Sequence, residues 1–492
     1  MQKYEPIALI ILDGFGYSSH KDGNALIPEN TKFITHLFKN YPSKYLHASG
    51  QAVGLPCKIP GNSQAGHLAI GTGQLILQSL TIMNTMIENK TFESNQLLIN
   101  KLLETKQKKR CVHIIGLASN GNVHGSIEHM LAYIKKAQQI DIDRIIIHPF
   151  LDGRDTLQKE ATTFLQAIDN IKTNQTIIGS IHGRFYAMDR DKNQERIAQT
   201  YSVLTKPENL VFTSWQKAIE HYYSQNLTDE YIPPTPLAAN ITINPGDLII
   251  HTNIRPERSI QLLELLSQLK EVSIISSIEY ENPIITTPII KNQIITECLK
   301  KRLHDTYKLR ISTIAETEKW AHVTYFFDGY CKNRNLSHET RIHIPSIKTE
   351  TYANKPEMSA SIITKTIIAQ IEAKKTDFCL ANYANTDMVG HTGNFNSTVT
   401  ATKIIDHEIS ILYKLIVERM KGTMIITGDH GNAEEMIDPI QKIPSGKHTT
   451  NPVPFIVACN TKCPSIKKVE TLTDIAWYIE SLVNKYHLIS RK

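Results

Sequence analysis

The sequence predicts an α/β protein with two domains, each a mainly parallel sheet covered by helices. A chain of 492 residues is long enough for two or three domains. One unit recurs along it: a short apolar run, a polar loop, then a helical pattern. The apolar runs are continuous rather than alternating, which is typical of parallel strands that helices cover on both faces.

Three of these runs end near an aspartate. The N-terminal run "IALIIL" is followed directly by Asp13, "FCLANY" leads to Asp387, and "GTMIIT" leads to Asp429. Open α/β sheets bind their ligands beyond the carboxyl ends of the strands. We therefore expect three separate strands to bring acidic side chains to one edge of a sheet.

Four units in the middle of the chain carry different side chains. The runs "CVHIIGLAS", "DRIIIHPF", "QTIIGSIHG" and "DLIIHTN" each precede a polar loop and a helical pattern. Five arginines in four equivalent loops favour a common binding role over unconnected solvated charges. The residues in these loops are His124, Arg154, Asp155, Arg184, Arg190, Arg255 and Arg258.

The order of these units predicts that one domain is inserted into the other. The acidic strand ends lie near residue 13 and beyond residue 377, and the arginine-rich loops lie between them. We expect a discontinuous domain of residues 1–82 and 290–492 and an inserted domain of residues 83–289. Hinges are expected near Thr81–Asn84 and Asn282–Lys291.

Aspartates and histidines of the outer domain have the character of metal ligands. Carboxylate and imidazole ligands suit hard to borderline divalent cations. Asp387 and His391 are four residues apart, so a helical turn places them on one face. Each of these residues alone would more often be a cap or a core residue, but the set favours two metal ions. Its members are Asp13, Asp387, His391, Asp429, His430 and His448.

Ser63, in "PGNSQAGHLAIG", is the candidate nucleophile. A divalent ion lowers the pKa of a bound water from about 16 to about 7, and a bound serine hydroxyl should respond in the same direction. A helical pattern follows Ser63, and helix N-termini favour anions. The alternative is that Ser63 only caps this helix.

These motifs together resemble one family. "LDGFG", "GNSQAGHLAIGTG", "LDGRDT", "GRFYAMDRD", "AETEKWAHVTYFF", "KPEMSA", "ANTDMVGHTG" and "TGDHGNAEEM" are similar to the cofactor-independent phosphoglycerate mutases of the alkaline phosphatase superfamily. The resemblance spans the whole chain in order. It implies a metal-binding phosphatase-like domain with an inserted transferase-like, substrate-binding domain.

The resemblance also implies roles for single residues. One metal ion, usually manganese, would be held by Asp13, Ser63, Asp429 and His430, and a second by Asp387, His391 and His448. Ser63 would become a phosphoserine. The phosphoglycerate would be bound by His124, Arg154, Asp155, Arg184, Arg190, Arg255, Arg258 and Lys319. Pro60, Gln64 and Ala65 depart from the usual nucleophile motif. Because none of them is a ligand, we expect these departures to tune the activity rather than abolish it.

The expected reaction interconverts 2- and 3-phosphoglycerate in glycolysis and gluconeogenesis without bisphosphoglycerate. Ser63 takes the phosphoryl group, arginines hold the glycerate while it reorients, and its other hydroxyl takes the group back. Lys319 and the metal ions stabilise charge. Asp155 is the candidate general acid and base, and domain closure would exclude water.

Other functions remain open at this point. A phosphatase or another phosphomutase would need the same serine and metal ions. The sulfatase nucleophile motif is absent around Ser63. A phosphate-ester sensor without turnover predicts a missing ligand, whereas all seven expected ligands are present.

Composition excludes little else. The formal net charge of +6 is small and scattered, so nucleic acid and membrane surfaces are not expected partners. Seven cysteines without a CxxC pair do not predict a disulfide framework, and a reducing cytoplasm suits them best. The resemblance implies a monomer.

Overall fold

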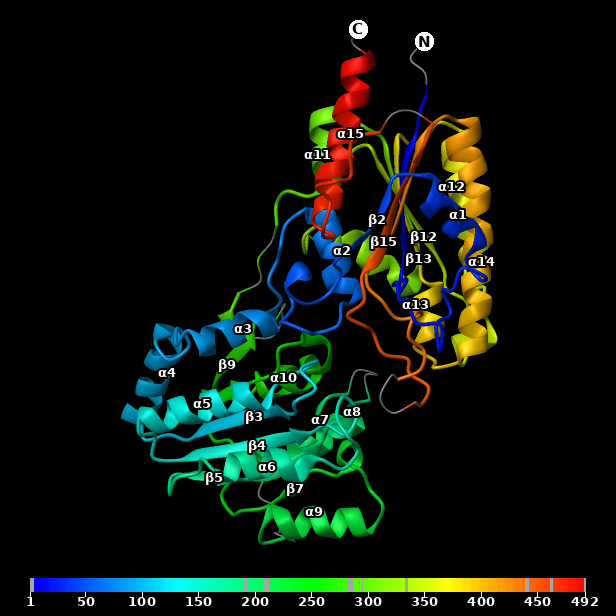
Figure 1. The fold of residues 1–492 in the computed structure, drawn as a ribbon. Helices are drawn as coiled ribbons and strands as arrows, with labels where there is room; N and C mark the ends of the chain where they lie inside the picture. Colours follow the sequence, from blue (N-terminus) through cyan, green and yellow to red (C-terminus); the bar gives the residue numbers. More distant parts are fainter. Residues whose placement is uncertain are drawn as a thin grey trace. The chain divides into compact units, whose positions relative to one another are not determined.

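The chain forms two compact units, which we describe separately. The computed structural model describes residues 4–189, 193–206, 212–280, 286–291, 293, 295–331, 335–438, 442–460 and 463–490. The first unit comprises Met1–Gln78 and Gln293–Lys492, and the second comprises Ser79–Asn292. The sequence predicted these crossings after residue 82 and before residue 290. The predicted α/β fold class, with two mainly parallel sheets, is confirmed (Figure 1).

The sheet of the first unit has seven strands among the described residues, in the order β12-β11-β13-β1-β14-β15-β2. The first five are parallel, and β15 is antiparallel to both of its neighbours. The strands, in sheet order, are Glu339–Ile344, Ile311–Glu316, Phe378–Tyr383, Ile7–Leu12, Thr423–Gly428, Val453–Cys459 and Ser43–Leu46. The strands that end near the three aspartates, β13, β1 and β14, are therefore adjacent at the centre.

Both faces of this sheet are covered, which explains the continuous apolar run of β1. Ile7, Leu9 and Ile11 pack in one core with helices α2 (Ser63–Thr72), α11 (Leu299–Tyr307) and α15 (Asp474–Ser490). Ala8, Ile10 and Leu12 pack in the other, with α1 (Lys32–Asn40), α12 (Ala360–Glu372) and α14 (Phe395–Tyr413). Successive side chains of a strand point to opposite faces, so an alternating pattern would have exposed one face.

The second unit repeats this architecture with the strand order β10-β9-β8-β3-β4-β6-β7, and β5 pairs with β4. In sheet order the strands are Thr287–Ile290, Ser273–Ile278, Leu248–His251, Val112–Ala118, Ile145–Leu151, Ser180–Gly183 and Thr235–Pro236, with β5 at Thr176–Ile178. The run "QTIIGSIHG" thus forms two short strands that Gly179 separates. Among the strands that the structure describes in this sheet, only β7 is antiparallel to its neighbour.

Helices also cover both faces of this second sheet. One core contains side chains of α3 (Ser79–Glu88), α4 (Gln96–Gln107), α5 (Ile127–Gln139), α6 (Ala161–Asp169) and α9 (Trp215–Ser224). The other contains side chains of the short helix α7 (Arg184–Ala187), α8 (Gln194–Thr205) and α10 (Ile260–Leu266). The predicted binding loops precede α5, α6, α8 and α10, and the loop before α8 contains the short helix α7.

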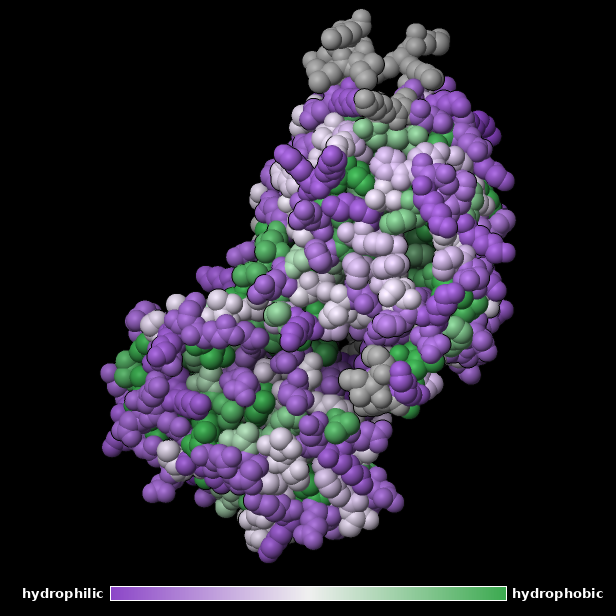
Figure 2. Space-filling view, viewed as in Figure 1, coloured by the Kyte–Doolittle hydropathy of each residue, from purple (hydrophilic) through white to green (hydrophobic). Residues whose placement is uncertain are grey.

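The surface is mostly polar in the view of Figure 2, with apolar side chains scattered among charged ones. None of the helices, over the residues that are described, is long and apolar enough to span a bilayer. Cys459 and Cys463 form a disulfide, which the cysteine pattern did not predict.

Buried neutral histidines make the second unit sensitive to acid. Burial lowers the pKa of His182 to about 3 and that of His251 to about 3. Below pH 6.5 these imidazoles therefore bind protons in the unfolded chain but not in the folded protein. The free energy of unfolding falls as the pH drops from 6.5 toward 3. At pH 5 each of these two histidines should lower the free energy of unfolding by about 2 kcal/mol.

We expect His182→Gln to shift the acid-unfolding midpoint to lower pH, because the glutamine amide can replace the contact of His182 Nε2 with Ser180 Oγ without taking up a proton. Tryptophan fluorescence followed from pH 7 to pH 4 measures the midpoint. His407→Gln, at an exposed histidine, is the matched control and should leave it in place. Equal midpoints for His182→Gln and the unsubstituted protein would contradict this expectation.

Candidate active site

Three buried carboxylates meet at the centre of the first sheet. Asp13 follows β1, Asp429 follows β14, and Asp387 lies in the short helix α13 (Asn385–Gly390) after β13. Parallel neighbouring strands end at the same sheet edge, so the fold brings these side chains together. Gly14 has a φ of +69°, and a Cβ on it would lie 2.8 Å from the Asp387 backbone. Only glycine allows this close approach.

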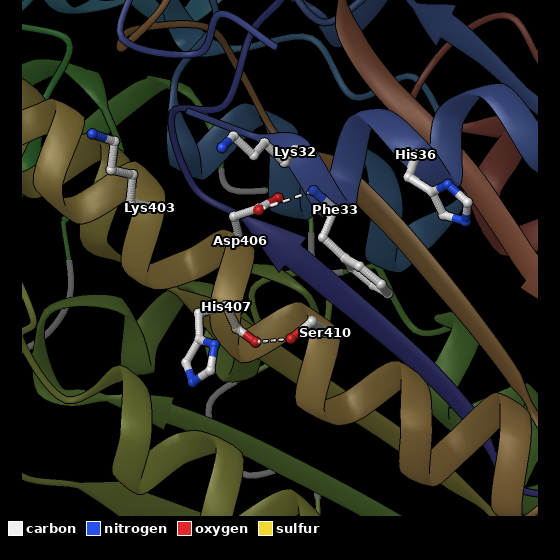
Figure 3. Close-up of a pocket in the computed structure, with 7 residues that line it drawn as sticks. All are labelled: Lys32, Phe33, His36, Lys403, Asp406, His407 and Ser410. Atoms are coloured by element: carbon white, nitrogen blue, oxygen red, sulfur yellow. Dashed lines mark hydrogen bonds between the residues drawn. The ribbon is translucent and has the colours of Figure 1, made fainter. Parts of the chain in front are cut away.

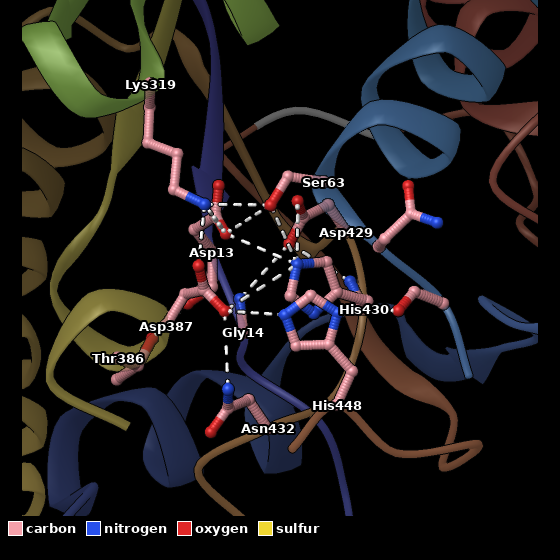
Figure 4. A network of polar contacts seen from close by, with 12 residues as sticks. Asp13, Gly14, Ser63, Lys319, Thr386, Asp387, Asp429, His430, Asn432 and His448 are labelled. Atoms are coloured by element: carbon pink, nitrogen blue, oxygen red, sulfur yellow. Dashed lines mark hydrogen bonds and ion pairs between the residues drawn. The ribbon is translucent and has the colours of Figure 1, made fainter. Parts of the chain in front are cut away.

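Three imidazoles surround the carboxylates, and Figure 4 shows two of them, His430 and His448. His430 Nε2 lies 3.4 Å from Asp13 Oδ1 and 3.6 Å from Asp429 Oδ2. His448 Nε2 is 3.1 Å and His391 Nε2 is 3.3 Å from Asp387 Oδ1. His391 Nε2 and His448 Nε2 are 3.0 Å apart, and the side chain of His391 is 44% exposed.

Backbone carbonyls orient these three rings. His391 Nδ1 is 2.8 Å from Gly446 O, His448 Nδ1 is 2.8 Å from Gly61 O, and His430 Nδ1 is 3.2 Å from Gly431 O. A carbonyl only accepts, so each Nδ1–H donates to it. Whenever such a ring is neutral, its Nε2 lone pair faces the carboxylates and can bind a metal ion there.

Ser63 is the first residue of α2, and its hydroxyl lies inside this cluster. Its Oγ is 2.8 Å from Lys319 Nζ, 2.9 Å from His430 Nε2 and 3.0 Å from Asp13 Oδ1. The side chain of Asn62, not of Ser63, caps the helix by accepting a hydrogen bond from the Ala65 N–H at 2.9 Å. The capping alternative for Ser63 is therefore wrong, and its hydroxyl is available for other contacts.

Lys319 comes from the short turn Thr317–Lys319 after β11 and is buried. Its Nζ lies 2.7 Å from Asp13 Oδ1 and 2.7 Å from Asp387 Oδ2. Burial alone would lower the pKa of Lys319, but the charges of Asp13 and Asp387 outweigh it and raise this pKa above its usual value. Lys319 is thus a permanent cation beside Ser63.

The charge of the cluster suits added cations. Burial alone would lower the pKa of His430, but Asp429 and Asp13 outweigh it and raise this pKa to about 10. Lys319 and a protonated His430 thus bring two positive charges to the three carboxylates of Asp13, Asp387 and Asp429. Asp429 Oδ2 is buried and accepts no hydrogen bond from the described residues.

The donor set therefore fits divalent cations. Two groups each bring three ligand atoms within 4.8 Å of one another, Asp13 with Asp429 and His430, and Asp387 with His430 and His448. Carboxylate oxygens and imidazole nitrogens suit borderline divalent ions, which also neutralise buried negative charge. His430 belongs to both groups, whereas the sequence assigned it to one.

A second cluster lies in the second unit, at the carboxyl ends of β3, β4 and β6. Arg184 Nη1 is 2.5 Å from Asp152 Oδ1 and 2.6 Å from Asp155 Oδ2. His124 Nε2 is 4.0 Å from Asp155 Oδ2. Burial alone would lower the pKa of the Arg184 guanidinium, but Asp152 and Asp155 raise it. The structure thus brings His124, Asp155 and Arg184 together.

The other predicted binding residues lie in the same loops with different partners. Arg154 forms an ion pair with Glu230 at 3.5 Å, and Arg255 with Glu257 at 2.6 Å. Arg258 donates from Nη1 to Met188 O at 3.3 Å. Arg190 lies outside the described residues.

Three polar residues outside the predicted ligand set lie around the carboxylates. The sequence motifs predict a structural role for one of them, His67, and none for Glu434 or Asn382. Glu434 accepts hydrogen bonds from the N–H groups of Gly16 and Asn432 and from Thr449 and Asn451, so it ties three loops together. Asn382 donates to Asp13 Oδ2 at 2.8 Å, and His67 Nδ1 lies 3.1 Å from Asp429 Oδ2. The available signals were a polar residue inside the buried run "FCLANY" and a histidine one turn after Ser63.

A surface depression of about 350 Å³ between α1 and α14 contains none of the predicted site residues (Figure 3). Asp406 at its centre accepts hydrogen bonds from the N–H groups of Phe33 and Ile34, so it caps α1. The other lining residues are Lys32, His36, Lys403, His407 and Ser410. We therefore place the candidate active site at the carboxylate cluster.

Comparisons with known proteins point the same way. A family model described as the metalloenzyme superfamily matches residues 5–483. The chain is 38% identical over 489 residues to the 2,3-bisphosphoglycerate-independent phosphoglycerate mutase of Clostridium tetani (strain Massachusetts / E88), covering 96% of this chain and 95% of that one. It is likewise 38% identical to the protein of the same name from Antithamnion sp., covering 97% and 96%.

A solved structure is similar over the same extent. The crystal structure of Leishmania mexicana phosphoglycerate mutase at low cobalt concentration matches with a TM-score of 0.79, covering 98% of this chain and 95% of that one. The sequence identity is 24%, so this likeness concerns the fold.

Proposed function

We propose that this protein interconverts 2- and 3-phosphoglycerate. The premise is that the chain belongs to the family of 2,3-bisphosphoglycerate-independent phosphoglycerate mutases, within the metalloenzyme superfamily. The family expected from the motifs is confirmed, and the protein is an enzyme of this family. The observation that carries the proposed chemistry is the position of Ser63 Oγ, 2.8 Å from Lys319 Nζ and among buried carboxylates and imidazoles. A buried hydroxyl in such surroundings suits nucleophilic attack.

Two divalent cations complete this proposed site, with manganese as the proposed ion. Asp13, Ser63, Asp429 and His430 would hold one, and Asp387, His391 and His448 the other. When bound, the ions would lower the pKa of the serine hydroxyl and offset negative charge on the transferring phosphoryl group.

The proposed transfer has two steps. Ser63 Oγ loses its proton and forms a bond to phosphorus, while the bond between phosphorus and the glycerate oxygen breaks and that oxygen gains a proton. The other glycerate hydroxyl then loses its proton and bonds to phosphorus, while the bond between phosphorus and Ser63 Oγ breaks and Ser63 Oγ takes a proton back. Lys319 Nζ touches Ser63 Oγ and would stabilise the charge that develops there.

The second unit would bind the glycerate part of the substrate. Arginine forks suit carboxylates and phosphates, and we assign this role to Arg154, Arg184, Arg190, Arg255 and Arg258, with His124. Asp155, which Arg184 holds at 2.6 Å, is the proposed acid and base for the two glycerate hydroxyls.

The direct test incubates the purified protein with 3-phosphoglycerate and a divalent ion, without 2,3-bisphosphoglycerate, and follows phosphorus NMR. We expect the 2-phosphoglycerate signal to appear until both isomers reach equilibrium. Glycerate and free phosphate as the products would replace this function with that of a phosphatase. The predicted monomeric state and cytoplasmic location remain predictions, which sedimentation and cell fractionation measure.

A further inference from the structure

Asn382 is a buried amide between helix α2, which begins at Ser63, and the carboxylate cluster. It lies on the central strand β13, is fully buried, and its Nδ2 is 2.8 Å from Asp13 Oδ2 and 2.9 Å from His67 Nε2. The Asp13 carboxylate only accepts, so the amide nitrogen must face it. The second N–H of this nitrogen is then directed at His67 Nε2.

This contact fixes the proton of His67. Because Nε2 accepts from Asn382, a neutral ring carries its hydrogen on Nδ1. His67 Nδ1 lies 2.8 Å from the carbonyl oxygen of Ser63 and 3.1 Å from Asp429 Oδ2. Both of these atoms repel a lone pair and attract an N–H. The tautomer with its proton on Nδ1 therefore suits these three contacts of the buried ring, and the tautomer with its proton on Nε2 suits none of them.

We propose that Asn382 and His67 are positioning residues that together hold Asp13, Asp429 and the backbone of Ser63 in the arrangement that binds the metal ion. The amide donates to Asp13 Oδ2, and the ring, whose Nδ1–H donates to Ser63 O, lies with Nδ1 3.1 Å from Asp429 Oδ2. The pair thus fills the space between two carboxylates from adjacent strands. This inference rests on the proposed function of these carboxylates as ligands. Residues that orient metal ligands in this way typically contribute 10–100-fold to affinity or activity.

Two substitutions of His67 separate positioning from simple packing. Asparagine carries its amide on Cγ, as histidine carries Nδ1, so His67→Asn can keep a donor for Ser63 O and Asp429. Glutamine extends one bond further, so His67→Gln places its amide near the Nε2 position, beside Asn382. We expect His67→Gln to bind Mn²⁺ about 10–100-fold more weakly than the unsubstituted protein, and His67→Asn, which keeps the donor to Ser63 O but loses the contact with Asn382, to have an affinity between the two.

The affinity is measured by calorimetry with Mn²⁺ alone, so it needs no substrate. In activity assays His67→Gln should lower kcat and leave KM nearly unchanged, since the arginine-rich loops are not altered. Equal Mn²⁺ affinities for His67→Gln and the unsubstituted protein would overturn the proposal.

A spectrum of the unsubstituted protein tests the same point without any variant having to fold. Nitrogen NMR of protein labelled with ¹⁵N-histidine, with His67→Asn used to assign the signal, should place the His67 proton on Nδ1 in the metal-free protein. A proton on Nε2 refutes the proposal. If the tautomer and affinities are as expected but phosphoglycerates are not interconverted, the proposed function fails and this inference stands.

Discussion

Replacing Ser63 by alanine is expected to reduce turnover by about 10⁴-fold or more, the loss typical of a removed nucleophile. The substitution removes the one oxygen that contacts Lys319 Nζ, Asp13 Oδ1 and His430 Nε2 together. Asn62 still caps α2, so the helix and the thermal stability should be retained. Phosphorus NMR measures the turnover, and circular dichroism measures the melting temperature.

Ser312→Ala is the matched control, because Ser312 is also a buried serine of the first unit and lies outside the cluster on β11. It should keep its activity. Mass spectrometry of the acid-quenched, unsubstituted enzyme should find a phosphoryl group on the peptide that contains Ser63. Substantial activity in Ser63→Ala would show that another group attacks phosphorus.

The sequence was sufficient for the central strands and their carboxylates. Continuous apolar runs before Asp13 and Asp429 indicated strands covered on both faces, and parallel strands end at one edge, so these side chains had to meet. The cap of α2 could also have been read locally, since Asn62 is a strong N-cap residue that directly precedes the helical pattern.

Contacts between distant segments could not be derived in this way. Lys319 and Asp13 are 306 residues apart, and only the family resemblance marked Lys319 for the site. No periodicity indicates that Glu434 would bind the Gly16 N–H or that Asn382 would bridge to His67. The antiparallel strand β15 was likewise not expected, because its apolar run has the same pattern as that of a parallel strand. Such partners depend on the three-dimensional register of strands, which the local pattern does not encode.

Removing divalent ions is expected to abolish turnover and to lower the melting temperature of the protein. Without added cations, the carboxylates of Asp13, Asp387 and Asp429 crowd one buried site. An ion at 100 times its dissociation constant should restore about 2.7 kcal/mol of stability. The measurement is thermal unfolding of chelated protein before and after Mn²⁺, Co²⁺ or Mg²⁺ is added singly, with bound metal counted by elemental analysis.

Metal binding should also release a proton, and its affinity should rise with pH. The pKa of His430, which burial alone would lower, is raised to about 10 by Asp429 and Asp13, so the ring is protonated at pH 7 in the metal-free protein. An imidazole must be neutral to bind a metal ion, so each binding event at this site must displace that proton. Calorimetry in two buffers of different ionisation enthalpy measures the number of protons released. His36→Gln, at a histidine outside the cluster, should not change that number, whereas His430→Gln should reduce it. A binding enthalpy that is the same in both buffers would contradict the placement of His430 at the metal site.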